Sequence, residues 1–136
     1  MELSRRAKVL LRKARADEYA VAKLLADPAC SDDVIGFHAQ QAVEKIVKAV
    51  LSSASVPYPY THDLVELIDL ARDHGLAFPQ ELEDVRFLTT FAAELRCGDP
   101  ETLGQPLDRQ WALDCVRRTK AWAETLLGQH PAERSP

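Results

Sequence analysis

One segment of the chain carries polar side chains whose types and spacing suit the recognition of a nucleotide. Residues 37–49 read FHAQQAVEKIVKA, and on a helix four of their polar side chains fall within a sector of about 80°: His38, Gln41, Lys45 and Lys48. An imidazole, an amide and two ammonium groups in a row can hold a phosphate and a base edge. The alternative is an ordinary helix surface, because Gln and Lys are good helix formers and Glu44 with Lys48 makes a routine i,i+4 pair.

Two other places carry side chains that suit a site but also have simple structural explanations. Thr61, His62 and Asp63 stand where a helix is expected to begin, so that Thr61 or Asp63 caps it and His62 fills a groove beside the preceding loop. Arg96 ends a largely apolar helix face, where a cation favours the helix dipole. Arg96 is also placed to reach a ligand, or Asp17, which interrupts an apolar stripe and needs a basic partner if it points inward.

The elements that must position these side chains are five helices. Apolar residues recur every three or four positions over residues 3–26, 31–55, 61–75, 79–98 and 107–127. Prolines and glycines separate these segments, most clearly in VPYPY at 56–60 and GDPETLGQP at 98–106. No segment alternates with a period of two. We therefore predict an all-α, up-and-down four-helix bundle with an additional short helix over residues 1–127, and a disordered tail at 128–136.

Composition limits the class of protein. The 136 residues fit one domain, and 46% hydrophobic with 28% charged residues indicate a real core under a polar surface. No apolar run of about 18 residues occurs, and the N-terminus lacks the apolar core of a signal peptide, so we expect no membrane association and a cytoplasmic location. The three cysteines, Cys30, Cys97 and Cys115, form no CxxC motif and indicate neither a disulfide framework nor a zinc site.

Charge is unevenly distributed along the chain. The net charge of −4 argues against a general nucleic-acid binder that neutralises phosphates. The first 23 residues nevertheless hold a local excess of bases over the acids Glu2, Asp17 and Glu18. These bases are Arg5, Arg6, Lys8, Arg12, Lys13, Arg15 and Lys23. Runs of this kind are mostly solvated helix faces, and whether this one contacts nucleic acid stays open.

Three motifs in order, FHAQQAVEKIVKAVL, THDLVEL and FAAELRCGDP, resemble the HEPN domain family over residues 3–127. The resemblance implies a fold of five helices based on a four-helix bundle, commonly a homodimer. It also implies a small partner, often a minimal nucleotidyltransferase, in pairs that frequently act as toxin–antitoxin modules. The family's motifs map onto His38, Gln41, Glu44 and Lys45, then onto His62, Asp63 and Leu64, and finally onto Arg96.

The chain departs from the ribonuclease members of that family. In those members, four to six residues follow the Arg and then comes a His. In this chain the residues four to seven places after Arg96 are Pro100, Glu101, Thr102 and Leu103, and none is a His. A related subgroup reads RYP where this chain has Arg96-Cys97-Gly98. Without the His, in-line cleavage of RNA lacks its usual general base.

We therefore expect a non-catalytic domain that binds a nucleotide such as ATP, a minimal nucleotidyltransferase, or both. The expected site residues are His38, Gln41, Glu44, Lys45, Lys48, His62, Asp63 and Arg96, with no metal. Two alternatives remain: a ribonuclease that takes its base from His38 or His62 across a dimer interface, and a scaffold whose polar stripe only satisfies buried partners.

A homodimer is also expected from the last helix. Trp111, Trp122 and Leu126 share one side of it and give more apolar surface than one short bundle needs. Ordinary core positions are the alternative for both tryptophans.

Overall fold

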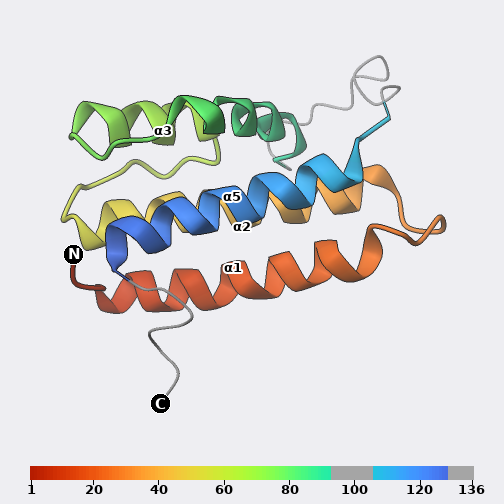
Figure 1. Cartoon of the computed structure of the whole chain (residues 1–136), viewed down its shortest axis with the longest axis horizontal. Coiled ribbons are helices and arrows are strands. Elements are labelled where there is room, and N and C mark those ends of the chain that lie inside the picture. Colours follow the sequence, from red (N-terminus) through yellow and green to blue (C-terminus); the bar gives the residue numbers. More distant parts are fainter. Residues whose placement is uncertain (93–105, 129–136) are drawn as a thin grey trace.

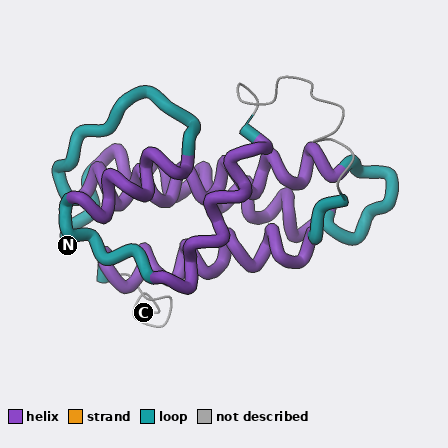
Figure 2. Tube along the Cα trace, turned by 90° about the horizontal axis from the view of Figure 1, so that it is seen from above, coloured by secondary structure: helices purple, strands orange, loops and turns teal. Residues whose placement is uncertain are grey.

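The computed structural model describes residues 1–92 and 106–128, and this part of the chain contains helices and no strand. The elements are α1 (Arg5–Leu24), α2 (Asp32–Ser53), α3 (Leu64–Asp73), the 3₁₀ helix η1 (Gln80–Phe91) and α5 (Arg109–Leu127). Helix α1 lies on one side, α2 and α5 lie in the middle, and α3 with η1 lie on the other side (Figure 1). Figure 2 shows the same helices and the loops between them from above. The prediction of an all-α helical bundle is confirmed.

Contacts between helix ends give the direction of each helix. Ser4, at the start of α1, bonds to Ser52 near the end of α2, so these two helices are antiparallel. The backbone N–H of Leu107 donates to Asp32, which brings the starts of α2 and α5 together. The end of η1 lies against the start of α2. Helices α1, α2, η1 and α5 therefore run up, down, up and down, and α3 is the additional short helix.

Side-chain caps start the helices close to the predicted places. Ser31, Asp63 and Asp108 each accept a hydrogen bond from a backbone N–H two or three residues ahead. Gly128 ends α5 in the left-handed region, with φ of 68°, which a glycine adopts without steric cost. No helix in the described ranges is long and apolar enough to cross a membrane.

The fourth helix differs from its prediction in type and in length. It is a 3₁₀ helix of 12 residues, and Ala92 after it has extended backbone angles, so the expected continuation as one helix to residue 98 is wrong. Its buried residues recur every third position, at Leu82, Val85 and Leu88, which matches three residues per turn. A 3₁₀ helix rises about 2.0 Å per residue, so these 12 residues span about 24 Å, whereas an α-helix would span about 18 Å. The greater rise lets a short segment run beside both α2 and α5.

A close approach between η1 and α2 requires a glycine at position 36. A Cβ atom on Gly36 would lie 2.3 Å from Cδ1 and 2.5 Å from Cγ of the Phe91 ring. We expect Gly36→Ala to lower the free energy of unfolding by about 1–2 kcal/mol in urea titrations, because displacing the ring outweighs the gain in helix propensity. In a Phe91→Ala background the same change should be neutral or stabilising. An equal loss in both backgrounds would contradict this explanation.

Candidate functional site

The polar residues of α2 fall into two separate hydrogen-bonded networks. In the first, Lys45 Nζ donates to Oδ2 of Asp17 at 2.5 Å, and His38 Nδ1 lies 3.0 Å from Oδ1 of the same carboxylate. Asp17 comes from α1 and is 8% exposed. The prediction that Asp17 points inward to a basic partner is confirmed, and the partners in the described chain are Lys45 and His38.

The second network is centred on Glu44, whose side chain is almost fully buried. Its carboxylate accepts from Lys48 Nζ at 2.9 Å, from Gln40 Nε2 at 2.9 Å and from His62 Nδ1 at 2.8 Å. Lys48 is itself only 9% exposed. Two opposite charges are thus removed from water together, and hydrogen bonds satisfy the carboxylate on several sides.

Gln40 is the residue of this region that sequence reasoning missed. Its side chain is fully buried, and besides Glu44 its Nε2 donates to the backbone carbonyl of His62 at 3.0 Å. Its Oε1 accepts from Nε2 of Gln41 at 2.7 Å. Gln40 therefore fastens the segment before α3 onto α2. The i,i+4 spacing of Gln40 and Glu44 was the available signal.

The loop between α2 and α3 covers the end of the second network. The Tyr58 ring lies close to two cations, with Arg6 Cζ 5.6 Å and Lys48 Nζ 5.8 Å from its centre. The Tyr58 hydroxyl also accepts from Arg6 Nε at 2.6 Å. A loop that reads as a simple break in the sequence thus joins the start of α1 to the end of α2.

Seven of the eight predicted site residues lie in the described ranges. Asp17 joins His38 with Lys45, Glu44 joins Lys48 with His62, and Gln41 is connected to Glu44 through Gln40. The Asp63 carboxylate caps α3. Arg96 lies outside the described residues, as do Cys97 and the predicted tail beyond Gly128.

These pairings change what the site can bind. Lys45 and Lys48 are each held by a carboxylate, so neither ammonium group is open to a phosphate unless it leaves its partner. The side chain of His38 is 33% exposed, and within the described chain only its Nδ1 forms a hydrogen bond. When the ring is neutral and Nδ1 donates to Asp17, Nε2 carries no proton and can accept a hydrogen bond. His38 Nε2 and Gln41 Oε1 are thus the groups on this face that remain for a ligand.

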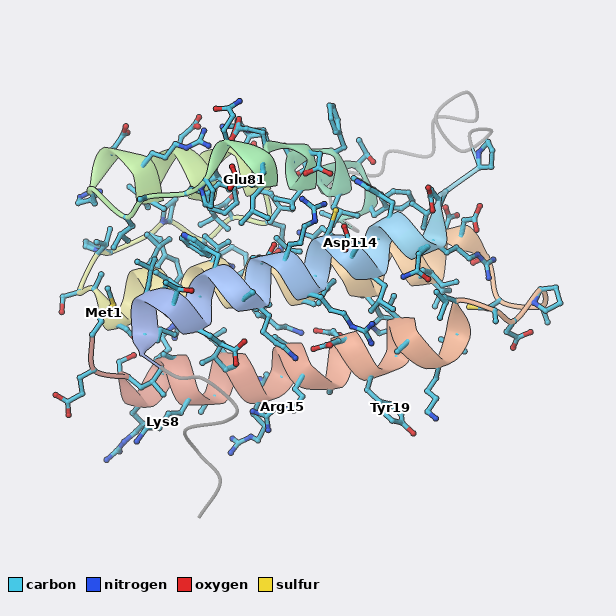
Figure 3. The ribbon with its side chains drawn as sticks, viewed as in Figure 1. Met1, Lys8, Arg15, Tyr19, Glu81 and Asp114 are labelled. Carbon is cyan, nitrogen blue, oxygen red and sulfur yellow. The ribbon has the colours of Figure 1, made fainter. Side chains whose placement is uncertain are left out.

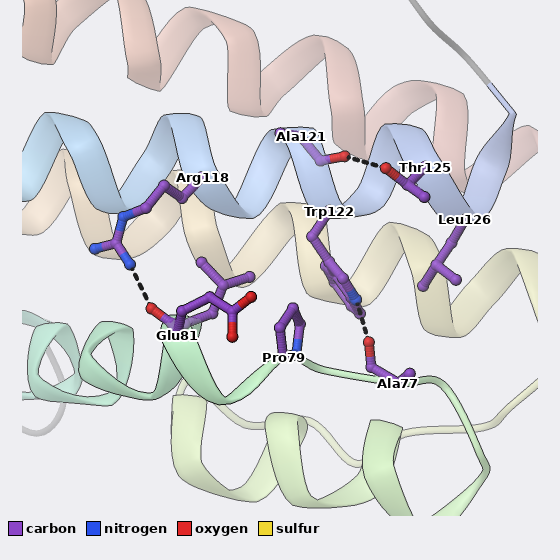
Figure 4. A pocket seen from close by; sticks show the side chains of 9 residues that line it. Ala77, Pro79, Glu81, Arg118, Ala121, Trp122, Thr125 and Leu126 are labelled. Atoms are coloured by element: carbon purple, nitrogen blue, oxygen red, sulfur yellow. Dashed lines mark hydrogen bonds between the residues drawn. The ribbon is translucent and has the colours of Figure 1, made fainter.

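The tryptophan side chains of α5 pack against other parts of this chain. The expectation that they form a surplus apolar surface for a dimer is therefore wrong. Trp122 is 7% exposed and donates its indole N–H to the carbonyl of Ala77 at 2.7 Å (Figure 4). Trp111 is half-buried and donates to Asp84 at 2.8 Å. Hydrogen bonds from Arg118 hold the pKa of Asp84 below its usual value. Trp122 also lines an open, mainly apolar pocket of about 470 Å³ that shares no residue with either network.

Cys115 is a buried thiol, and the described residues contain no group of side chains that could hold a metal ion. Burial raises the pKa of Cys115 to about 12, so its thiol stays protonated at neutral pH. Across residues 1–92 and 106–128, no three His, Cys, Asp or Glu side chains are grouped closely enough to hold a metal ion.

Comparison with known proteins identifies a family whose model matches this chain. The family model for the HEPN domain matches residues 7–127, which includes α2, α3 and both networks. Neither curated proteins nor solved structures give a significant match. The five-helix order and the family match agree over nearly the whole chain. This chain belongs to the HEPN domain family.

Proposed function

We propose that this chain is a non-catalytic HEPN domain that binds a minimal nucleotidyltransferase, a nucleotide such as ATP, or both, in a toxin–antitoxin-type module. The observation that carries the proposal is the fixed orientation of His38 at the surface by the buried carboxylate of Asp17. The lack of a histidine at the ribonuclease spacing after Arg96 supports a binding role. The homodimer is part of the proposal and rests on family membership alone.

The chemistry of the α2 face favours recognition by hydrogen bonds over recognition by charge. His38 Nε2 and Gln41 Oε1 stand three residues apart on one helix face, where they suit the edge of a base or the amides of a partner. Preorganised side chains lose little conformational entropy on binding. Lys45 then acts as a positioning residue for Asp17 and, through it, for His38.

Removal of the two open groups tests the proposal. We expect His38→Ala/Gln41→Ala to lower the amount of partner or nucleotide that copurifies with the protein from its source cells by about tenfold, measured by native mass spectrometry. The matched control is His74→Ala/Gln80→Ala, which removes the same residue types from exposed positions at the end of α3 and the start of η1. Equal retention by both variants, each with unchanged circular dichroism, would remove the assigned site.

Lys45→Ala distinguishes this site from a purely structural scaffold. The binding hypothesis and the scaffold hypothesis both predict that Lys45→Ala lowers the free energy of unfolding by about 1–3 kcal/mol, because the mostly buried Asp17 loses a charged partner. Only the binding reading predicts that partner or nucleotide retention also falls. Unchanged retention would assign both networks to stability alone.

A ribonuclease is the second candidate function, and one observation favours it. A carboxylate-bound imidazole with an open Nε2, as in His38 with Asp17, is an arrangement that can act as a general base. Cleavage of a labelled single-stranded RNA that is abolished by His38→Ala would support this candidate. Absence of turnover at high protein concentration would count against it.

A further inference from the structure

The outer face of α1 carries a straight row of side chains, which we call the basic stripe. Its members follow at i, i+3, i+7, i+10, i+14 and i+18, and all are exposed: Arg5, Lys8, Arg12, Arg15, Tyr19 and Lys23. At about 100° per residue they fall within a sector of about 80°. The buried residues of α1 occupy the opposite side. In Figure 3, Lys8, Arg15 and Tyr19 point away from the bundle.

The acidic and basic side chains of α1 lie on different sides of the helix. Both acids of this helix face other helices, since Asp17 binds Lys45 of α2 and Glu18 binds Lys120 of α5 at 3.0 Å. The cations of the basic stripe form no ion pair with any described residue. Lys23 lies over the ring of Tyr19, 5.5 Å from its centre. The stripe is therefore a continuous cationic face on a protein whose net charge is negative.

This arrangement does not serve the stability of α1. The first turn holds no acid, and its cations oppose the positive end of the helix dipole. Cations three and four residues apart, such as Lys8 with Arg12 and Arg12 with Arg15, repel each other. A polyanion laid along the face would convert these repulsions into attraction.

We propose that the basic stripe binds a single-stranded nucleic acid along its phosphate backbone. Eighteen residues separate Arg5 from Lys23, a rise of about 27 Å, which corresponds to about eight nucleotides of a stacked strand at about 3.4 Å each. Arginine forks suit phosphate oxygens. Tyr19 is 65% exposed, and an exposed aromatic ring in a cationic row is suited to stack an unpaired base, which a duplex does not offer.

The test is fluorescence anisotropy of a labelled ~12-nucleotide oligouridylate at about 50 and 200 mM NaCl. We expect salt-sensitive binding that Arg12→Gln/Arg15→Gln weakens about tenfold at the lower salt. The slope of log affinity against log salt should become shallower by about 1.4, because about 0.7 is lost for each phosphate contact to a single strand. Tyr19→Ala should weaken binding about fivefold, and Tyr19→Phe should retain it.

A matched variant controls for the loss of net charge. Arg72→Gln/Arg86→Gln also removes two arginines, from the layer of α3 and η1 on the far side of the molecule (Figure 1), and should leave affinity within about twofold. Circular dichroism of every variant verifies the fold.

Four results would overturn the proposal. They are no binding at the lower salt, equal weakening by the control, preference for a duplex of the same length, and displacement by polyglutamate at equal charge concentration. The last would assign the stripe to an acidic protein partner. None of these residues belongs to the α2 face, so this proposal and the proposed function stand or fall separately.

Discussion

Glu44→Ala is expected to lower the free energy of unfolding by about 3 kcal/mol, among the largest effects of any single substitution in this chain. Glu44 is 3% exposed and is the only described carboxylate that binds Lys48. Its removal leaves a nearly buried ammonium group without a counter-ion and also takes an acceptor from Gln40 and His62. This expected loss lies at the low end of the range for broken buried ion pairs, because the Lys48 side chain is 11% exposed and can shift toward water.

Urea denaturation followed by circular dichroism measures this loss, and a double-mutant cycle separates its cause. Lys48→Met in a Glu44→Leu background should recover at least half of the stability, because the uncompensated charge is then gone. Glu66→Ala removes an exposed Glu from α3 and should change the free energy by less than about 0.5 kcal/mol. A loss below about 1 kcal/mol for Glu44→Ala would mean that the network contributes little to stability.

Arg109→Ala is the second substitution with a large expected effect, about 2–4 kcal/mol. The Arg109 guanidinium binds Asp32 at 2.8 Å and donates to the carbonyls of Leu24, Leu25, Asp27 and Cys30. It joins the end of α1, the turn after it and the start of α2 to the start of α5. Without it, the last carbonyls of α1 lose their donor in a half-buried place.

The same urea experiment with two further variants checks the geometry at Arg109. Arg109→Lys keeps the positive charge but lacks the several N–H donors of the planar guanidinium group. It should recover less than half of the free energy of unfolding that Arg109→Ala loses. Arg117→Ala is the control on the same helix, since Arg117 is 55% exposed with one ion pair at 3.4 Å, and should cost less than about 0.5 kcal/mol. Full recovery by lysine would show that charge alone matters here.

The pH dependence of this junction follows from Asp32. Hydrogen bonds from the Leu107 N–H and from Arg109 hold the pKa of Asp32 below its ordinary value of 3.8. The folded state therefore binds a proton at Asp32 less readily than the unfolded state does. Ionised Asp32 makes its full contribution to the free energy of unfolding above about pH 4. It is lost as the pH falls further, through the lowered pKa of the folded protein.

Local signals in the sequence were sufficient for most of the helix framework. Helix starts at Ser31, Asp63 and Asp108 and the break at 56–60 all depend on residues within four positions of each other. The spacing of His38, Gln41 and Lys45 on one helix is equally local, and so was predictable. The first two family motifs, at residues 37–51 and 61–67, lie on these same local patterns, and the family match covers both.

The pairing of the polar residues depends on contacts between helices. Lys45 meets Asp17 from 28 positions away and His62 meets Glu44 from 18, and no local periodicity encodes such pairs. The 3₁₀ geometry of η1 was not predictable either, because its apolar spacing also fits an α-helix. This geometry accompanies the packing of η1 along α2 and α5. The excess of cations in α1 can be read directly from the amino-acid sequence. Because Asp17 and Glu18 pack against other helices, that excess becomes a cationic face without ion pairs to any described residue, since charges pair through space and not along the chain.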